Sequence, residues 1–139
     1  MLKELQAFEK NEVVLHCLPE NALAIYPTEV WRQMRTEEPR PAVRAAGSLA
    51  YRRRLRRFGA FTQIEQLSNQ GRLTIPVLFR DSLSLQPGGR AVIVGIEIGV
   101  EIWSETVWDK ELAAIKEYES QRLRKEMDQE LKNGEVDYD

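Results

Sequence analysis

An internal repeat is the feature that most constrains how this chain of 139 residues can fold. When the sequence is shifted by 77 positions, residues 23–31 align with residues 100–108 without a gap, and an isoleucine, a valine and a tryptophan coincide. The same offset places residues 14–17 on the apolar residues 91–94. Because separate matches share one offset, a duplicated unit explains them better than chance. The sequence therefore predicts two related halves.

The second half carries the clearest strand pattern. Alternating or β-branched residues predict strands at 61–67, 72–75, 90–96 and 100–103. The turn formers Ser68-Asn69-Gln70-Gly71 separate the first two strands and predict a β-hairpin. Pro76 suits the first position of a short helix at 77–85, with Leu78 and Phe79 expected to face the core.

Three further helices are expected. Residues 29–34 predict a short helix, and the apolar spacing across 43–58 predicts a longer one of about four turns. Ser104 is a candidate N-cap for a charged helix that follows the last strand. This helix is expected to fray near Asn133-Gly134, because its apolar stripe thins toward that point.

The net charge of −2 conceals a strong asymmetry. Residues 32–57 hold nine arginines and two glutamates, whereas residues 105–139 hold six basic and eleven acidic groups. A basic block can follow the phosphates of a nucleic acid, or it can form packed and ion-paired helix faces. For the arginines of 52–57 the sequence favours packing or salt bridges, with the acidic tail as one candidate partner.

The rare reactive residues argue against catalysis. The single cysteine and single histidine, Cys17 and His16, exclude a disulfide framework and any zinc spacing. In a strand their side chains should lie on opposite faces, as a packing thiol and a surface or loop-proximal imidazole. The sequence has no glycine-rich phosphate loop, no Ser-His-Asp set and no apolar run near the ~20 residues of a membrane span. We therefore expect a cytoplasmic protein that is not an enzyme, with no cofactor, metal, membrane or small-molecule substrate.

The segment 67–76 and the pair that follows it give a more specific signal. They resemble the second half of the MraZ family of bacterial transcriptional regulators, within the SpoVT-AbrB-like superfamily. The family signature has an acid, two loose positions, Gly-Arg, an alternating strand, proline and an apolar-basic pair. The matching residues are Gly71, Arg72, Pro76, Phe79 and Arg80, whereas Ser68 replaces the acid. The likeness extends over most of residues 1–110.

The resemblance implies an α+β fold: a swapped-hairpin AbrB-like β-barrel with a pseudo-two-fold repeat, linker helices and a long C-terminal helix. It divides the chain into a truncated first SpoVT-AbrB-like repeat (1–31), a basic helical linker (32–59), a second repeat (60–107) and a charged C-terminal helix and tail (108–139). Met1 aligns with Leu78, so the first repeat begins after its own Gly-Arg strand. A start codon assigned too far downstream and a truly shortened protein both explain this.

The resemblance also implies a function. It suggests a sequence-specific repressor of a bacterial cell-division and cell-wall gene cluster, acting on nucleoid DNA at repeated operator boxes as a ring-shaped homo-oligomer. The 67–76 β-hairpin would enter the major groove of double-stranded DNA. The expected DNA-binding residues are Asn69, Gln70, Gly71, Arg72, Thr74 and Arg80. The alternatives are a truncated assembly subunit that does not bind DNA, and an AbrB-like antitoxin whose residues 119–139 bind a toxin.

Overall fold

The computed structural model describes residues 11–36 and 41–138. These residues belong to two compact units, Met1–Ser104 and Glu105–Asp139. In chain order the elements are β1 (Glu12–Cys17), β2 (Leu23–Pro27), α2 (Thr28–Thr36), α3 (Pro41–Gly47), α4 (Leu49–Ala60), β3 (Thr62–Gln66), α5 (Val77–Ser82), β4 (Ala91–Gly95), β5 (Val100–Ser104) and α6 (Glu105–Tyr138). None of the helices in the described ranges is long and apolar enough to cross a bilayer.

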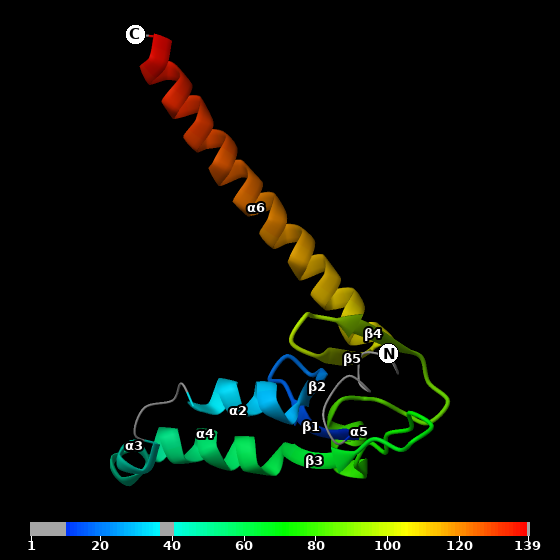
Figure 1. The fold of residues 1–139 in the computed structure, drawn as a ribbon. Helices are drawn as coiled ribbons and strands as arrows, with labels where there is room; N and C mark the ends of the chain where they lie inside the picture. Colours follow the sequence, from blue (N-terminus) through cyan, green and yellow to red (C-terminus); the bar gives the residue numbers. More distant parts are fainter. Residues whose placement is uncertain (1–10, 37–40, 139) are drawn as a thin grey trace. The chain divides into compact units, whose positions relative to one another are not determined.

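The first unit is built on one antiparallel sheet with the strand order β3-β1-β2-β5-β4 (Figure 1). The α+β class and the long C-terminal helix are confirmed. The expected barrel is not confirmed, because the sheet formed by the described residues is open, with β3 and β4 at its edges. Closure requires a strand that joins these edges, and the segment expected to add a strand, residues 72–75, does not pair into the sheet.

The internal repeat is visible in the pairing at the centre of the sheet. A shift of 77 positions carries the bounds of β2 onto those of β5. The shift carries Leu23 onto Val100 and Ile25 onto Ile102. In the sheet Leu23 pairs with Ile102 and Ile25 pairs with Val100, so the two pairs are equivalent in the repeat. Ala24 pairs with Glu101 between them. The two halves therefore meet about a pseudo-two-fold axis through this central pair.

One face of the sheet forms the main core. Alternate residues of β1, β2 and β5 supply its strand layer, which Phe79 of α5 and Leu83, the residue just after α5, cover. The Phe79 and Phe61 rings lie 6.4 Å apart between centroids. Phe79 is 2% exposed as expected, but Leu78 is 56% exposed, so the prediction that both face inward was wrong for Leu78. Neighbouring helical residues point about 100° apart, and in the six-residue α5 Phe79 points toward the sheet and Leu78 toward solvent.

The opposite face carries an aromatic cluster between the sheet and α2 and α4. His16 stacks on Phe58 with ring centroids 5.0 Å apart and lies 5.2 Å from Trp31. Trp31 also stacks on Tyr26 at 5.9 Å. His16 is buried and its Nδ1 is hydrogen-bonded to Thr62 Oγ1 at 2.9 Å. The prediction that the His16 side chain lies at the surface is therefore wrong, because α2 and α4 cover the face of the sheet on which it lies.

The helix predicted across 43–58 is two helices, α3 and α4. Ser48 interrupts it with extended backbone (φ −141°, ψ 116°), and its hydroxyl accepts a hydrogen bond from the Tyr51 amide at 3.1 Å. A serine in this position satisfies one of the free amides at a helix start. The apolar spacing continued through this break, and so it did not reveal the break.

The second unit is the single 34-residue helix α6. The helix continues through Asn133-Gly134, where the sequence predicted fraying, to Tyr138. Large apolar side chains are exposed along its length, and they are Ile115, Tyr118, Leu123, Met127 and Leu131.

Candidate nucleic-acid interface

A closed turn follows β3 and holds four of the six residues predicted to bind DNA, Asn69, Gln70, Gly71 and Arg72. The Gly71 amide donates to the Ser68 carbonyl, and the Ser68 amide donates to the Arg72 carbonyl, each at 2.9 Å. The Ser68 hydroxyl accepts from the Arg72 amide at 2.9 Å. Gly71 has φ 78°, a conformation that glycine adopts without the strain a side chain would add. Ser68, which replaces the family acid, thus fixes the turn from within.

Beyond the turn, residues 72–75 do not form the predicted strand. Their burial still alternates: Leu73 and Ile75 pack against the core, whereas Arg72 and Thr74 are exposed. The alternation therefore predicted which side chains face inward. The predicted β-hairpin is wrong. In the described chain, a single backbone hydrogen bond, between Ser68 and Arg72, joins residues 72–75 to the residues just after β3, and Leu73 and Ile75 pack in the core instead of extending the ladder.

Four of the six predicted residues have exposed side chains close together in sequence. Asn69 and Gln70 occupy the tip of the turn, Arg72 follows it, and Thr74 lies two residues further on. Gly71 is half-buried within the turn. No carboxylate of the described residues forms an ion pair with Arg72. The turn thus presents two amides and a guanidinium, unpaired with any described carboxylate, to solvent.

Arg80 lies apart from the turn, on α5. It is half-buried, and its Nε is enclosed without a hydrogen-bond partner in the structure. α5 begins at Val77, after Pro76 at its N-cap, and is held by Phe79 and the following Leu83 in the core. The structure therefore does not bring Arg80 into the exposed set formed by Asn69, Gln70 and Arg72.

The arginines of α4 are a second basic surface, to which the sequence assigned packing or salt bridges. Two of them pack on aromatic rings: the Arg57 guanidinium lies 5.3 Å from the Phe61 centroid, and that of Arg54 lies 5.8 Å from the Tyr51 centroid. Within the described part of residues 1–104, no carboxylate forms an ion pair with the arginines at positions 53, 54, 56 and 57. The acidic tail belongs to the second unit, so a salt bridge to it stays a prediction.

His16 and Cys17 lie on opposite faces of β1, as predicted. Cys17 belongs to the main core, and burial raises the pKa of its thiol to about 11. Burial, followed by the positive charge of Arg57, lowers the pKa of His16. A thiol that stays protonated and a buried neutral imidazole are poor starting points for nucleophilic catalysis.

Comparison with known proteins gives one family. The family profile described as "MraZ protein, putative antitoxin-like" matches residues 59–131, which include the candidate turn. A protein named Transcriptional regulator MraZ from Bifidobacterium longum (strain NCC 2705) is 29% identical over 98 residues, covering 70% of this chain and 62% of that protein. Another of the same name, from Cutibacterium acnes (strain DSM 16379 / KPA171202), is 33% identical over 91 residues, covering 66% and 61% respectively. The chain thus spans about three fifths of the length of these curated relatives.

Proposed function

Because this chain belongs to the MraZ family, we propose that it is a sequence-specific, DNA-binding transcriptional regulator that reads DNA with residues 67–76. The observation that carries the proposal is the turn between Ser68 and Arg72, which presents amides and a guanidinium to solvent on a hydrogen-bonded frame. The name of the two relatives, Transcriptional regulator MraZ, supports the same function.

Each exposed group has a chemistry suited to DNA. The planar fork of Arg72 matches the O6 and N7 acceptors of guanine in the major groove, or two oxygens of one phosphate. The amides of Asn69 and Gln70 match adenine edges, which offer one donor and one acceptor. Thr74 and Arg80 are assigned supporting contacts, with Arg80 directed at a phosphate. Gly71 lets the backbone of the turn approach the duplex closely.

The regulatory context is part of the proposal. We infer a repressor of a cell-division and cell-wall gene cluster that binds repeated operator boxes on nucleoid DNA in the cytoplasm. A ring of identical subunits would place several turns on adjacent boxes, and linked contacts gain affinity without any new contact. The proposal keeps the segments 1–31 and 60–107 as two SpoVT-AbrB-like repeats in a swapped-hairpin barrel, with the linker 32–59 between them and the charged helix 108–139 after them.

Selection from a pool of random-sequence duplexes tests this function. The chain should enrich a defined motif, and Arg72→Ala should weaken binding to that motif by about 1–3 kcal/mol and relax the preference at one base pair. Arg90→Ala removes the same charge from an exposed arginine outside the turn and is the matched control. Fluorescence anisotropy measures both variants.

Two results would contradict the proposal. If Arg72→Ala keeps both affinity and sequence preference, Arg72 does not read DNA. If no motif is enriched while the chain self-associates, it is instead an assembly subunit that does not bind DNA.

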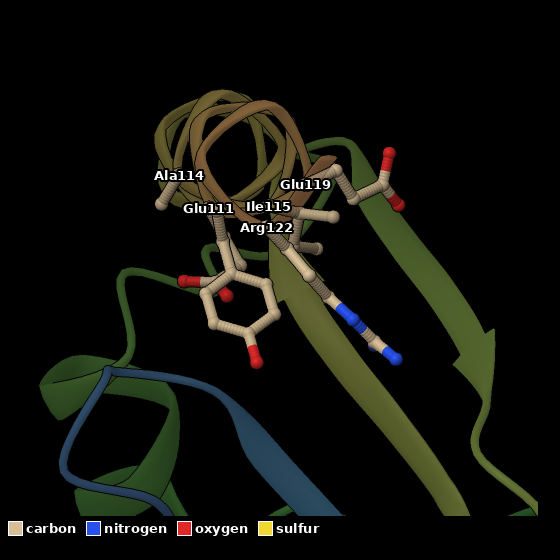
Figure 2. Close-up of a pocket in the computed structure, with 6 residues that line it drawn as sticks. Glu111, Ala114, Ile115, Glu119 and Arg122 are labelled. Atoms are coloured by element: carbon tan, nitrogen blue, oxygen red, sulfur yellow. The ribbon is translucent and has the colours of Figure 1, made fainter. Parts of the chain in front are cut away.

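A second candidate function, that of an antitoxin, is favoured by α6. The family description includes the words "antitoxin-like", and the helix exposes Leu123, Met127 and Leu131 at a spacing of four residues. A shallow groove of about 460 Å³ lies further toward its start (Figure 2), lined by Glu111, Ala114, Ile115, Tyr118, Glu119 and Arg122. An exposed apolar stripe on a charged helix is a surface that a partner protein can cover.

Co-expression distinguishes this candidate. If the chain is an antitoxin, it should restore growth to cells that express a small toxin from a neighbouring gene, and Leu123→Asp with Met127→Asp should abolish the rescue. Rescue that survives this double change, or the absence of any toxic neighbour, would exclude the antitoxin function at this surface.

A further inference from the structure

Helix α4 has two chemically distinct sides. Tyr51, Leu55 and Phe58 recur at intervals of four and three residues, which places them on one helical face. Tyr51 is buried, and Phe58 stacks on His16 above the sheet. The remaining positions of the helix hold five arginines and no acidic residue, and the arginines are Arg52, Arg53, Arg54, Arg56 and Arg57.

The spacing of these arginines brings like charges together. Residues three or four apart on a helix are neighbours on its surface. Arg53 therefore lies beside both Arg56 and Arg57, Arg52 lies beside Arg56, and Arg54 lies beside Arg57. Each such like-charge pair destabilises a helix. Within the described part of residues 1–104, no carboxylate forms an ion pair with the arginines at 53, 54, 56 and 57, so none of those carboxylates offsets this repulsion.

Neighbouring aromatic rings hold part of this charge in place. Besides the contacts of Arg54 with Tyr51 and of Arg57 with Phe61, the Arg35 guanidinium of α2 lies 4.6 Å from the Phe58 centroid. Rings contact a guanidinium through its flat face and leave its N–H edge available. The side chains of Arg53 and Arg56 are exposed, and no side-chain hydrogen bond, ion pair or ring contact links them to the rest of the described chain.

The choice of arginine is informative. All nine basic residues of the segment 32–57 are arginine, whereas four of the six in residues 105–139 are lysine. Either residue keeps a surface soluble, but the guanidinium fork fits a phosphate through two parallel hydrogen bonds. The surface is therefore suited to phosphate groups.

We propose that the α4 basic face, defined as Arg53, Arg56 and Arg57, binds the phosphate backbone of double-stranded DNA independently of sequence. From Arg53 to Arg57 the helix rises about 6 Å, which is comparable with about two phosphates along one strand. The contact extends the proposed regulatory function, because it adds a second DNA-binding surface to the unit that carries the Ser68–Arg72 turn. It supplies affinity, whereas the turn supplies sequence preference.

Salt-dependent binding to a random-sequence duplex tests the inference. Neutralising two phosphate contacts with Arg53→Gln and Arg56→Gln should make the slope of log K against log salt concentration shallower by roughly 1.8. The affinity ratio of the original chain to this variant should then shrink about twelvefold between 50 and 200 mM salt. Arg124→Gln with Lys125→Gln removes the same charge from exposed positions on α6 and should leave the slope unchanged.

The outcomes separate this surface from the turn. Arg72→Ala should retain most of the affinity for random duplex. If the original chain binds random duplex through α4 but enriches no motif, the proposed sequence-specific function is refuted and this inference stands. An unchanged slope in the α4 variant, or an equal change in the α6 control, would overturn it. If the α4 variant instead loses self-association and keeps its DNA affinity, the arginines bind carboxylates of a second copy, which also overturns the inference.

Discussion

Replacing Phe79 with alanine should lower the free energy of unfolding of the sheet unit by about 3–5 kcal/mol. Phe79 is almost completely enclosed in the main core, where its ring contacts that of Phe61. Removing a buried phenyl group loses its transfer free energy and leaves a cavity that the surrounding side chains only partly fill. Since small proteins are stable by only about 5–15 kcal/mol, this loss is a large fraction of the total.

The change should also reach the candidate DNA-binding turn. α5 has six residues and is too short to persist as an isolated helix. Phe79 and Leu83 hold it against the sheet, and the chain between the turn and α5 is short. Loosening α5 therefore increases the freedom of Arg72, and we expect a fall in sequence-specific affinity as well as in stability.

Urea unfolding followed by tryptophan fluorescence measures the effect, with Leu78→Ala as the control. Leu78 is more than half exposed, so its truncation should cost ~1 kcal/mol or less. Equal losses in the two variants would refute the packing described for α5. A loss below ~1 kcal/mol for Phe79→Ala would refute it more directly.

Three further predictions concern single residues of the first unit. Cys17, whose thiol pKa is raised to about 11 by burial, should react with a thiol reagent only after the protein unfolds, and rapid labelling of the native chain would contradict its place in the core. Burial and Arg57 lower the pKa of His16. Between this lowered pKa and the ordinary value of 6.5, the unfolded chain therefore binds more protons than the folded chain. Stability should therefore fall as the pH drops through that value, and urea titrations of His16→Gln should show a weaker dependence. A side chain at Gly99 would collide with the Ile25 carbonyl oxygen, so Gly99→Ala should be destabilising by about 1–3 kcal/mol in thermal unfolding, whereas Gly59→Ala, which has open space, should not.

Local patterns predicted the elements that depend on neighbouring residues. The β-branched runs near 91–95 and 100–104 became β4 and β5, and the turn formers at Ser68 to Gly71 became a turn. Alternation around Leu73 also predicted which side chains enter the core. These signals succeed because side-chain direction along an extended chain follows from backbone geometry alone.

Features that depend on distant partners were not predicted. Nothing near residues 72–75 indicates that they lack a ladder partner, because pairing is decided by the strands available elsewhere. The burial of His16 likewise depends on Trp31 and Phe58, which reach it from α2 and α4. Gly47-Ser48 did carry a local signal for a helix break, since serine is a favoured N-cap, but the apolar spacing on both sides outweighed it.

The candidate site also combines features that the sequence predicted with features that depend on distant partners. Family resemblance identified the exposed residues around Arg72, and their accessibility follows from the turn. It did not indicate that Arg80 is half-buried, because that depends on how α5 packs on the sheet. The arginines of α4 were visible as a basic block, yet only the structure shows that the described carboxylates leave several of them unpaired.

The repeat explains why the centre of the sheet was predictable and its closure was not. The pairing of β2 with β5 is symmetric, so two copies of one sequence favour it from both sides. At the edges the halves differ, because β3 covers β1 while β4 is the last strand of the described sheet. β3 carries Gln63 and Glu65, which suit an edge exposed to water, whereas β4 has no charged residue and exposes Ile93. Duplication therefore dictates the contact between the copies, and whether the sheet closes depends on the sequences at its two different edges.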